Sequence, residues 1–478
     1  MKQKIAVAKG DGIGPEIMDS VLTVFRSAQV PLDYELVEMG KSVFEKGFSN
    51  GMTPEAAKTV EDLGILFKGP METPKGKGVK SINVTARKVW NTYANKRVFR
   101  SLNGVETVFS KAGIPIDMIV VRENIEDTYG GIEHMLTPDV ALCRRFITRP
   151  GSLQVHRYAF EMARAEGRKK VTCGHKANIM KITDGLFLET FYEVAKEYPE
   201  IIANDIIVDD LSMKLVSKPH EFDVVVLPNL QGDIVSDLCA GLVGGLGFAP
   251  SANIGEHISI FEAVHGTAPD IAGKGLANPT ALLISGIMML RHLELHTWAD
   301  RISAALFSAL EDGYHTADFG SDPKKKCSTE EFTAVICSRL EGGIIPEKTE
   351  WQKPTGRTQN KILKTKFPKE SKCVGVDFFV ESVMQPADVA AYFQKHFGSE
   401  LNLVTMSNRG TQVYPKGSVF TDCIDQYRVR IQKTDQSEMS SDEILHLASK
   451  ISSGMKICSL EWLMNYDGVN AFSLAQGQ

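Results

Sequence analysis

The stretch KIAVAKGDGIGPEIMDSVLTVF, residues 4–25, contains the pattern on which the fold depends. A short apolar run is followed by a glycine-rich turn, and helical periodicity begins near Pro15, because proline is favoured in the first turn of a helix. A strand, a turn and a helix in this order are typical of α/β proteins. The segment therefore predicts a fold in which strands and helices alternate.

The same alternation recurs further along the chain. Residues 116–124 and 220–229 are continuous apolar runs, as expected for strands that are buried on both faces of a sheet. Residues 152–170 and 182–199 show the periodicity of amphipathic helices. Together these segments predict an α/β fold class for the first three quarters of the chain.

The C-terminal region has a different organisation. At 478 residues the chain is too long for one hydrophobic core. Residues 343–368 are polar, basic and proline-bearing, which predicts a linker. Residues 369–478 contain segments that we interpret as strand, helix, strand, strand and helix. We expect them to form a separate α+β domain.

Composition narrows the class of protein. The chain has 43% apolar and 24% charged residues and a net charge of -5, which favours a soluble globular protein without a general nucleic-acid-binding surface. The 8 cysteines are scattered and form no CxxC pair, so we expect a reducing compartment. The sequence has no segment that resembles a signal peptide or a membrane span, so cytoplasm is the predicted location.

The glycines of the first turn do not match the usual dinucleotide-binding pattern. Gly10, Gly12 and Gly14 are spaced as GxGxG and not as GxGxxG, and no acidic residue ends a second strand at the required distance. A tight turn without a phosphate is an equally good interpretation. The sequence therefore does not predict a Rossmann-type dinucleotide site here.

A basic stretch, KSINVTARKVWNTYANKRVFRS, offers donor side chains for an anion, and one further arginine ends the strand VVREN. Guanidinium groups that converge in this way bind carboxylates through paired hydrogen bonds. A solvated helix face is the alternative, but the strand-end arginine favours a ligand site, since α/β sheets bind ligands beyond the carboxyl ends of their strands. The candidate residues are Ser81, Asn83, Arg87, Arg97 and Arg122.

Two aspartates, Asp233 and Asp237, lie four residues apart in NLQGDIVSDLCAGLVGG and therefore share one face of a helix, where their charges repel. With Asp209 they form an oxygen-only ligand set, which suits Mg²⁺ or Mn²⁺ and not zinc. A bound cation would remove the repulsion. Stabilisation by the helix dipole is the alternative, but it explains Asp233 better than Asp237.

Two further residues could transfer protons. Lys176 follows the apolar strand KKVTC, and Tyr129 lies in ENIEDTYGG. A lysine at the ligand-binding edge can act as an acid or a base if burial or a nearby cation lowers its pKa. A solvated lysine is the alternative.

Six motifs in one order resemble the metal-dependent decarboxylating β-hydroxyacid dehydrogenases, the isocitrate and isopropylmalate dehydrogenase family. They are GDGIGPE, SINVTAR, VRENIEDTYGG, HKANIMKITDG, QGDIVSD and HGTAPDIAGKGLANP. The resemblance implies that family's non-Rossmann α/β fold with large and small domains, plus a C-terminal α+β domain of a longer bacterial type. The expected boundaries are 1–95 and 251–342 for the large domain and 96–250 for the small, dimer-forming domain with its clasp.

The resemblance also implies roles for these residues. Arg87, Arg97 and Arg122 would bind substrate carboxylates, and Tyr129 and Lys176 would carry protons. The metal ligands would be Asp209, Asp233 and Asp237. Family members are homodimers with shared active sites, in which the equivalents of Lys176 and Asp209 come from the neighbouring subunit.

Substrate and cofactor follow from the same resemblance. Ser81 and Asn83 are polar where a branched alkyl substrate would need apolar side chains, which favours isocitrate over homoisocitrate or 3-isopropylmalate. A non-catalytic regulatory subunit is the remaining alternative. The acid at Asp270 favours NAD, since it can accept a hydrogen bond from a ribose hydroxyl and would repel a 2′-phosphate. The expected cofactor residues are His265, Gly266, Thr267, Ala268, Asp270, Ile271 and Asn278.

Overall fold

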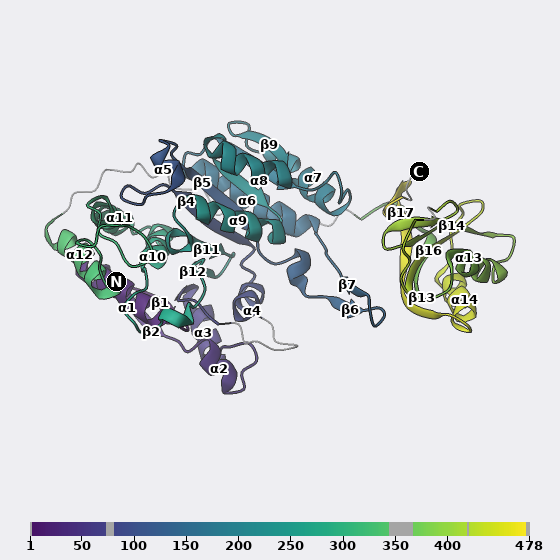
Figure 1. Ribbon diagram of the computed structural model, residues 1–478, viewed down its shortest axis with the longest axis horizontal. Coiled ribbons are helices and arrows are strands. Elements are labelled where there is room, and N and C mark those ends of the chain that lie inside the picture. Colours follow the sequence, from purple (N-terminus) through teal and green to yellow (C-terminus); the bar gives the residue numbers. More distant parts are fainter. Residues whose placement is uncertain (1, 73–80, 344–366, 418–419, 475–478) are drawn as a thin grey trace. The chain divides into compact units, whose positions relative to one another are not determined.

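The computed structural model describes residues 2–72, 81–343, 367–417 and 420–474 (Figure 1). The chain forms two compact units. The first consists of residues 1–129 and 146–361, and the second of residues 130–145 and 362–478. The predicted linker, 343–368, lies largely outside the described residues. The proposed division of the first unit into a large and a small domain stays a prediction.

A 10-stranded mixed sheet is the centre of the first unit, in the order β2-β1-β3-β12-β11-β4-β5-β10-β8-β9. Most neighbours are parallel, but β4 runs antiparallel to β5 and β11, and β11 to β12. The strands are β1 (Gln3–Ala8), β2 (Leu32–Leu36), β3 (Ile65–Lys68), β4 (Ala94–Arg100), β5 (Asp117–Glu123), β8 (Lys170–His175), β9 (Ile202–Ile207), β10 (Val224–Leu227), β11 (Pro250–Ile254) and β12 (Ser259–Ala263). We call β2, β1, β3, β12 and β11 the first half-sheet and the other strands the second half-sheet.

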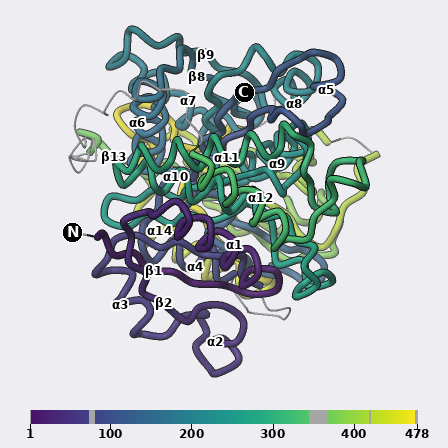
Figure 2. Tube along the Cα trace, turned by 90° about the vertical axis from the view of Figure 1, so that its left-hand side faces the viewer, coloured from purple at the N-terminus to yellow at the C-terminus, as the bar shows by residue number. Residues whose placement is uncertain are grey.

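Helices cover both faces of this sheet. In the first half-sheet α1, α10, α11 and α12 pack against one another (Figure 2). In the second, α9 and α6 contact β4 and β5. The helices are α1 (Gly14–Ser27), α2 (Lys41–Glu45), α3 (Pro54–Leu63), α4 (Ile82–Val89), α5 (Val108–Lys111), α6 (Arg149–Ala165), α7 (Thr183–Ala195), α8 (Val208–Ser217), α9 (Asn229–Leu242), α10 (Thr280–His292), α11 (His296–Glu311) and α12 (Thr329–Glu341).

The N-terminal strand, turn and helix are confirmed. Strand β1 is buried over its last four residues, and α1 begins at Gly14 with Pro15 in its first turn. The turn needs glycine for a steric reason, because a Cβ atom on Gly12 would lie 2.1 Å from the carbonyl oxygen of Thr267. Gly12 also has a φ of 59°, which disfavours other residues. The glycine turn therefore packs closely on the segment that begins at His265.

The second unit contains a 6-stranded antiparallel sheet in the order β15-β14-β16-β13-β17-β18, together with the small hairpin β6 (Glu133–Met135) and β7 (Ala141–Cys143). The predicted α+β class is confirmed, but one long strand, β17, was missed. Its alternating sequence KICSLEWLMNY contained the signal. The elements are β13 (Ser371–Glu381), α13 (Pro386–Lys395), β14 (Leu401–Asn408), β15 (Thr411–Tyr414), β16 (Gln426–Lys433), α14 (Ser441–Ser452), β17 (Lys456–Tyr466) and β18 (Val469–Asn470).

Within the described ranges, none of the helices has the length and apolar character that crossing a membrane requires.

Candidate active site

Two buried arginines lie side by side at the centre of the large sheet. Arg97 on β4 and Arg122 near the end of β5 are 4% and 1% exposed. Both strands turn these side chains toward α9, where a small residue is required: a Cβ atom on Gly232 would lie 2.7 Å from the Arg122 side chain. Burial is costly for a guanidinium, so both groups need anionic or hydrogen-bonding partners.

Helix α9 supplies those partners through its two aspartates. Arg97 contacts Asp233 and Asp237, with a nitrogen–oxygen distance of 3.3 Å in each case. Arg122 also donates to Asp233, and the Tyr129 hydroxyl donates to the other Asp233 oxygen at 2.6 Å. The repulsion expected between the two aspartates is therefore partly offset by arginines, an explanation that the sequence reasoning did not consider.

The pKa values of the site reflect burial and these charges. Burial opposes ionisation of Asp233, but the Arg122 and Arg97 charges and the Tyr129 hydrogen bond hold its pKa below the usual value. Burial and the nearby Asp233 charge raise the pKa of Asp237. Burial, followed by repulsion from Arg97 and Arg87, lowers the pKa of Arg122 to about 10. The arginines repel one another, so a further anion would stabilise the cluster.

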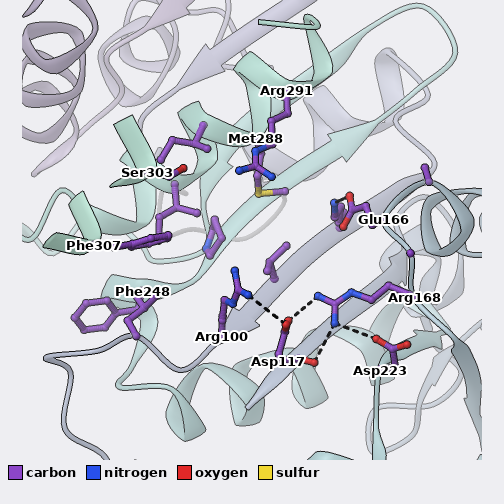
Figure 3. A pocket seen from close by; sticks show the side chains of 18 residues that line it. Arg100, Asp117, Glu166, Arg168, Asp223, Phe248, Met288, Arg291, Ser303 and Phe307 are labelled. Carbon is purple, nitrogen blue, oxygen red and sulfur yellow. Dashed lines mark hydrogen bonds and ion pairs between the residues drawn. The ribbon is translucent and has the colours of Figure 1, made fainter. Parts of the chain in front are cut away.

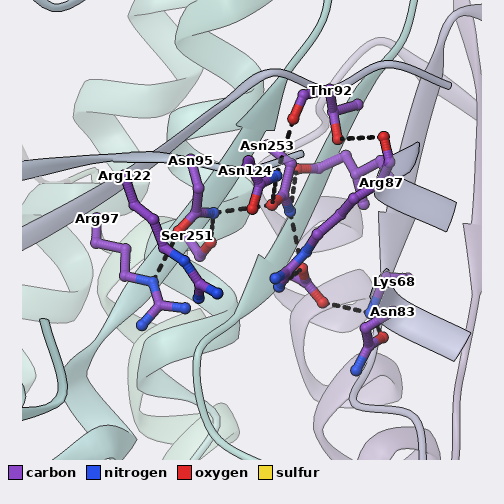
Figure 4. A network of polar contacts seen from close by, with 12 residues as sticks. Lys68, Asn83, Arg87, Thr92, Asn95, Arg97, Arg122, Asn124, Ser251 and Asn253 are labelled. Carbon is purple, nitrogen blue, oxygen red and sulfur yellow. Dashed lines mark hydrogen bonds and ion pairs between the residues drawn. The ribbon is translucent and has the colours of Figure 1, made fainter. Parts of the chain in front are cut away.

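A second buried ion pair was missed by the sequence analysis (Figure 4). Lys68, at the end of β3, is 1% exposed and forms an ion pair with Glu262 on β12. Glu262 also accepts hydrogen bonds from Arg87 at 3.0 Å and from Asn253 at 2.8 Å. Burial alone would raise the pKa of Glu262, but the Lys68 and Arg87 charges hold it well below the usual range. Lys68 and Glu262 are each the one charge in an otherwise apolar strand, ILFK or SIFEA, and this pattern could have indicated the pair.

Asparagines connect this pair to Arg97 across β4 and β11. The Asn95 amide donates to Asn253 at 2.9 Å, and its carbonyl accepts from Arg97 Nε at 2.8 Å. The Asn124 amide also donates to Asn253, at 3.0 Å (Figure 4). Such a network fixes side-chain positions because the Asn95 and Asn124 amides and Arg97 Nε all have acceptors. Arg87 and Arg97 are thus held relative to each other by a continuous set of hydrogen bonds.

Helix α4 brings the other predicted substrate residues to the same region. Asn83 accepts a hydrogen bond from Lys68 Nζ at 2.9 Å, and Ser81 immediately precedes the helix. The Nε atom of Arg87 is buried and has no hydrogen-bond partner within the described part of the chain. An unsatisfied buried donor is costly, and an acceptor on a ligand would satisfy it.

Lys176 and Asp209 lie apart from this cluster in one chain. They pair with each other at 2.5 Å on the surface, where the Asp209 side chain is 69% exposed. No hydrogen bond or ion pair between described residues joins them to Tyr129 or Asp233. Likewise, no three metal-binding side chains meet within the described ranges. One chain therefore brings together Asp233 and Asp237 but not the predicted third ligand, Asp209.

The predicted cofactor segment lies against the glycine turn. The Ile13 amide donates to the Thr267 carbonyl at 2.9 Å. The Nε2 atom of His265 is buried and lacks a partner among the described residues, and burial lowers the pKa of that histidine. Asn278 donates to Asp318 at 3.1 Å. Gly266, Ala268 and Ile271 lie on the same stretch, which ends in the short 3-10 turn Pro269–Ile271.

Known proteins resemble the whole chain. A Thermus thermophilus protein named isocitrate dehydrogenase (NADP) is 45% identical over 100% of this chain and 96% of its own length. An Arabidopsis thaliana protein named isocitrate dehydrogenase (NAD) catalytic subunit 5, mitochondrial, is 49% identical over 69% of this chain and 87% of its own length. A crystal structure of a protein from Thermus thermophilus, 45% identical, matches with a TM-score of 0.93 and covers 99% of this chain and 96% of that chain.

The prediction of NAD dependence is contradicted, because the full-length relatives, at 38% to 45% identity, are named as NADP enzymes. That prediction depended on Asp270, on the absence of a lysine–tyrosine pair at positions 270 and 271, and on the absence of tyrosine and arginine in residues 315–321. Asp270 is exposed, so water screens its charge and it need not repel a phosphate. The segment bonded to Asn278 also leads to three consecutive lysines at 324–326, whose positive charge the prediction ignored.

Family models agree with both parts of the structure. A model described as Isocitrate/isopropylmalate dehydrogenase matches residues 4–336, which include every predicted site residue. A second, described as Bacterial isocitrate dehydrogenase, C-terminal domain, matches residues 371–478. The buried arginines, the paired aspartates of α9 and the C-terminal antiparallel sheet all lie within these matches. The chain therefore belongs to the isocitrate/isopropylmalate dehydrogenase family.

Proposed function

We propose that this protein catalyses the oxidative decarboxylation of isocitrate to 2-oxoglutarate and CO₂, with a nicotinamide cofactor and Mg²⁺ or Mn²⁺. The observation that supports this most directly is the cluster of Arg87, Arg97 and Arg122 beside the carboxylates of α9. Three guanidinium groups suit a small molecule with several carboxylates, because each can form paired charge-assisted hydrogen bonds.

The polar groups on α4 support isocitrate as the substrate. Asn83 and Ser81 can donate to a third carboxylate, whereas the alkyl group of isopropylmalate offers no acceptor to these polar side chains. Homoisocitrate, which also has three carboxylates, is the alternative. Lys68 pairs with Glu262 and donates to the side-chain oxygen of Asn83. The NH₂ group of Asn83 is therefore the part of that amide that can donate to a ligand.

The residues of α9 fit a hard divalent cation. Asp233 and Asp237 offer only oxygen ligands and are partly open, with side chains 34% and 56% exposed. Asp209 of a second copy would complete the set. A cation bound there would acidify the substrate hydroxyl and stabilise the negative charge that forms as CO₂ is lost.

Tyr129 would donate a proton in this reaction, and its contacts support that role. Its hydroxyl is hydrogen-bonded to Asp233, and the Arg122 guanidinium lies 4.7 Å from the centre of its ring. Burial, followed by the hydrogen bond to Asp233, raises the pKa of this tyrosine, so it stays protonated at neutral pH. A protonated phenol can reprotonate the carbon that has lost CO₂. Lys176 would act as the second proton carrier from the other copy.

A second copy is also favoured by the surface of α8 and α9. These two neighbouring helices expose large apolar side chains, which on a monomer would contact water. The exposed fractions are 56% for Met213, 48% for Val216 and 64% for Ile234. We propose a homodimer with shared active sites in the cytoplasm. Analytical ultracentrifugation of the full chain would test the dimer, and a monomer at micromolar concentration would contradict it.

An initial-rate assay tests the function. Purified full-length protein should reduce a nicotinamide cofactor in the presence of isocitrate and Mg²⁺, and should do so more efficiently than with homoisocitrate or 3-isopropylmalate. Running both nicotinamide cofactors in parallel compares the enzyme with its NADP-named relatives. Chelation of the cation should abolish the rate. Isocitrate binding by calorimetry without any turnover would instead identify a regulatory subunit.

A further inference from the structure

A cavity of about 570 Å³ lies between the sheet and helices α10 and α11 (Figure 3). Side chains alternate along a strand, so Lys96, Val98 and Arg100 of β4 point away from the face that carries Arg97. All three line the cavity. Its volume falls in the range of small-molecule sites, about 300–1,000 Å³.

The two half-sheets each provide one wall. In Figure 3, the wall from the second half-sheet carries Arg100, Asp117 and Arg168, and the helices of the first half-sheet carry Met288 and Phe307. The active site is divided in the same way, since Arg87 and Glu262 come from the first half-sheet side and Arg97 and Arg122 from the second. A molecule in the cavity would therefore contact both halves that form the active site.

About half of the residues that line the cavity are apolar. Helices α10 and α11 contribute aliphatic, thioether and aromatic groups, and β4 contributes the half-buried Val98. Leu102, Ala165, Phe248 and Pro250 add to the apolar lining. The residues of α10 and α11 are Ile284, Ile287, Met288 and Phe307. Such a lining suits an apolar ligand body of modest size.

The acidic groups of the lining already have cationic partners. Arg168 donates to Asp117 at 2.6 Å and to Asp223 at 3.0 Å. Glu166 forms an ion pair with Lys96. The carboxylates are thus neutralised by neighbours, which leaves little capacity to bind a cation.

Two arginines, in contrast, have donors for which the described residues provide no acceptor. The closest carboxylate oxygen to Arg100, on Asp117, is 3.7 Å away, which is beyond hydrogen-bond distance. Arg291 pairs with Asp300 at 3.1 Å, but its Nε atom is buried and has no hydrogen-bond partner among the described residues. Because buried guanidinium donors are normally satisfied, this atom indicates a place for an acceptor.

We propose that the cavity is an effector site for a small organic anion that has an apolar body and one carboxylate or phosphate group. The apolar body lies between β4 and α10, and the anion accepts from Arg291 or Arg100. Since the ligand joins the two half-sheets behind the active site, its binding changes the spacing of the arginines and alters the affinity for substrate.

Calorimetry with 4-phenylbutyrate tests the binding step without any assumption about turnover. The full-length protein should bind one equivalent, and the uncharged 4-phenylbutyramide should bind at least about tenfold more weakly, because a charge-assisted hydrogen bond is lost. Met288→Trp and Val98→Phe fill the cavity from opposite walls, and each should weaken binding at least about tenfold. Met384→Trp, in the second unit, is the matched control and should bind like the wild type.

Kinetics test the coupling, which depends on the proposed function. Saturating 4-phenylbutyrate should change the KM for isocitrate at least about twofold in the wild type and not in Met288→Trp. Unaltered binding in both cavity-filling variants, or equal binding of acid and amide, would overturn the site. Binding with no change in KM would overturn its role as an effector site. A protein that binds the probe but has no activity would contradict the proposed function and not the site.

Discussion

Two buried arginine clusters of this protein have opposite characters. In the first unit, Arg97 and Arg122 share the carboxylates of α9 and repel each other. In the second unit, Arg430 is 1% exposed and has a partner for each of its three nitrogens, with two hydrogen bonds to Asp377 and one to the Ser473 carbonyl. The Arg430 guanidinium is also covered by the Phe472 ring at 4.8 Å.

The difference separates a binding site from a structural ion pair. Arg430 and its carboxylate partner Asp377 are both buried, so this pair holds the sheet together and offers no open group to a ligand. Arg97 and Arg122 repel each other and lie beside the half-open carboxylates of α9. The neighbouring Arg87 has an unsatisfied nitrogen. Such a cluster gains stability when an anion binds. The nitrogens of Arg97 and Arg122 also have partners, so the two clusters differ in the half-open carboxylates of α9 and in the unsatisfied Nε atom of Arg87.

The largest effect should follow from breaking the structural pair. Asp377→Ala leaves the Arg430 charge buried without its carboxylate, which should lower the free energy of unfolding of the second unit by about 3–5 kcal/mol. Differential scanning calorimetry would measure the change. Asp388→Ala, an exposed position on α13, is the matched control and should stay within about 0.5 kcal/mol of wild type. A loss no greater than in this control would contradict the structural role.

Glu123 is a buried carboxyl group for which the described residues show no ion pair, unlike the carboxylates that the arginines contact. Glu123 is 2% exposed, and its carboxylate accepts hydrogen bonds from the backbone amides of Ile125 and Glu126. Burial, and to a lesser degree the charge of Glu126, raises its pKa to about 7. Between pH 4.5 and pH 7 the folded protein keeps a proton that the unfolded chain releases. Stability contributed by this group is therefore lost as the pH rises through that window, by about 3 kcal/mol in total.

Chemical unfolding at several pH values checks this expectation. Between pH 4.5 and pH 7, Glu123 should make the free energy of unfolding fall by up to about 1.4 kcal/mol per pH unit. Glu123→Gln should remove this contribution to the slope. Glu133→Gln, at an exposed position of β6, should leave the slope unchanged. Equal slopes in the wild type and Glu123→Gln would show that the carboxyl ionises normally.

The sequence predicted the fold class and the individual residues of the site better than their contacts. Arg122 at the end of a buried strand and Asp233 and Asp237 on one helix face could be placed from local patterns. The arginine contacts of those aspartates could not, because Arg97 comes from β4, and only the completed sheet order places β4 beside β5 and under α9. Lys68 and Glu262 were missed for the same reason, since β3 and β12 are far apart in the sequence.

A smaller change in the binding cluster should affect catalysis more than folding. Arg122→Lys keeps the charge next to Asp233 but loses the planar donor pair that also contacts Asn229. We expect kcat/KM for isocitrate to fall about 100-fold, which corresponds to about 2.7 kcal/mol. Arg26→Lys, on the exposed side of α1, should retain wild-type kinetics. A lower free energy of unfolding with unchanged kcat/KM would show that Arg122, like Arg430, has a structural role.

The smallest expected effect compares the two units through the same substitution. Ser440 and Ser328 each cap a helix, α14 in the second unit and α12 in the first, in a capping box with a glutamate three residues later. Replacing either serine with alanine removes an acceptor for a backbone amide and should cost about 1 kcal/mol. If the units unfold separately, calorimetry should show two transitions. Ser440→Ala should lower the midpoint temperature of one of them only, the same transition that Asp377→Ala lowers. Because α12 packs on α1, Ser328→Ala should lower the other transition. A single transition shifted equally by both variants would instead mean that the two units unfold together. Both arginine clusters would then contribute to the same free energy of unfolding.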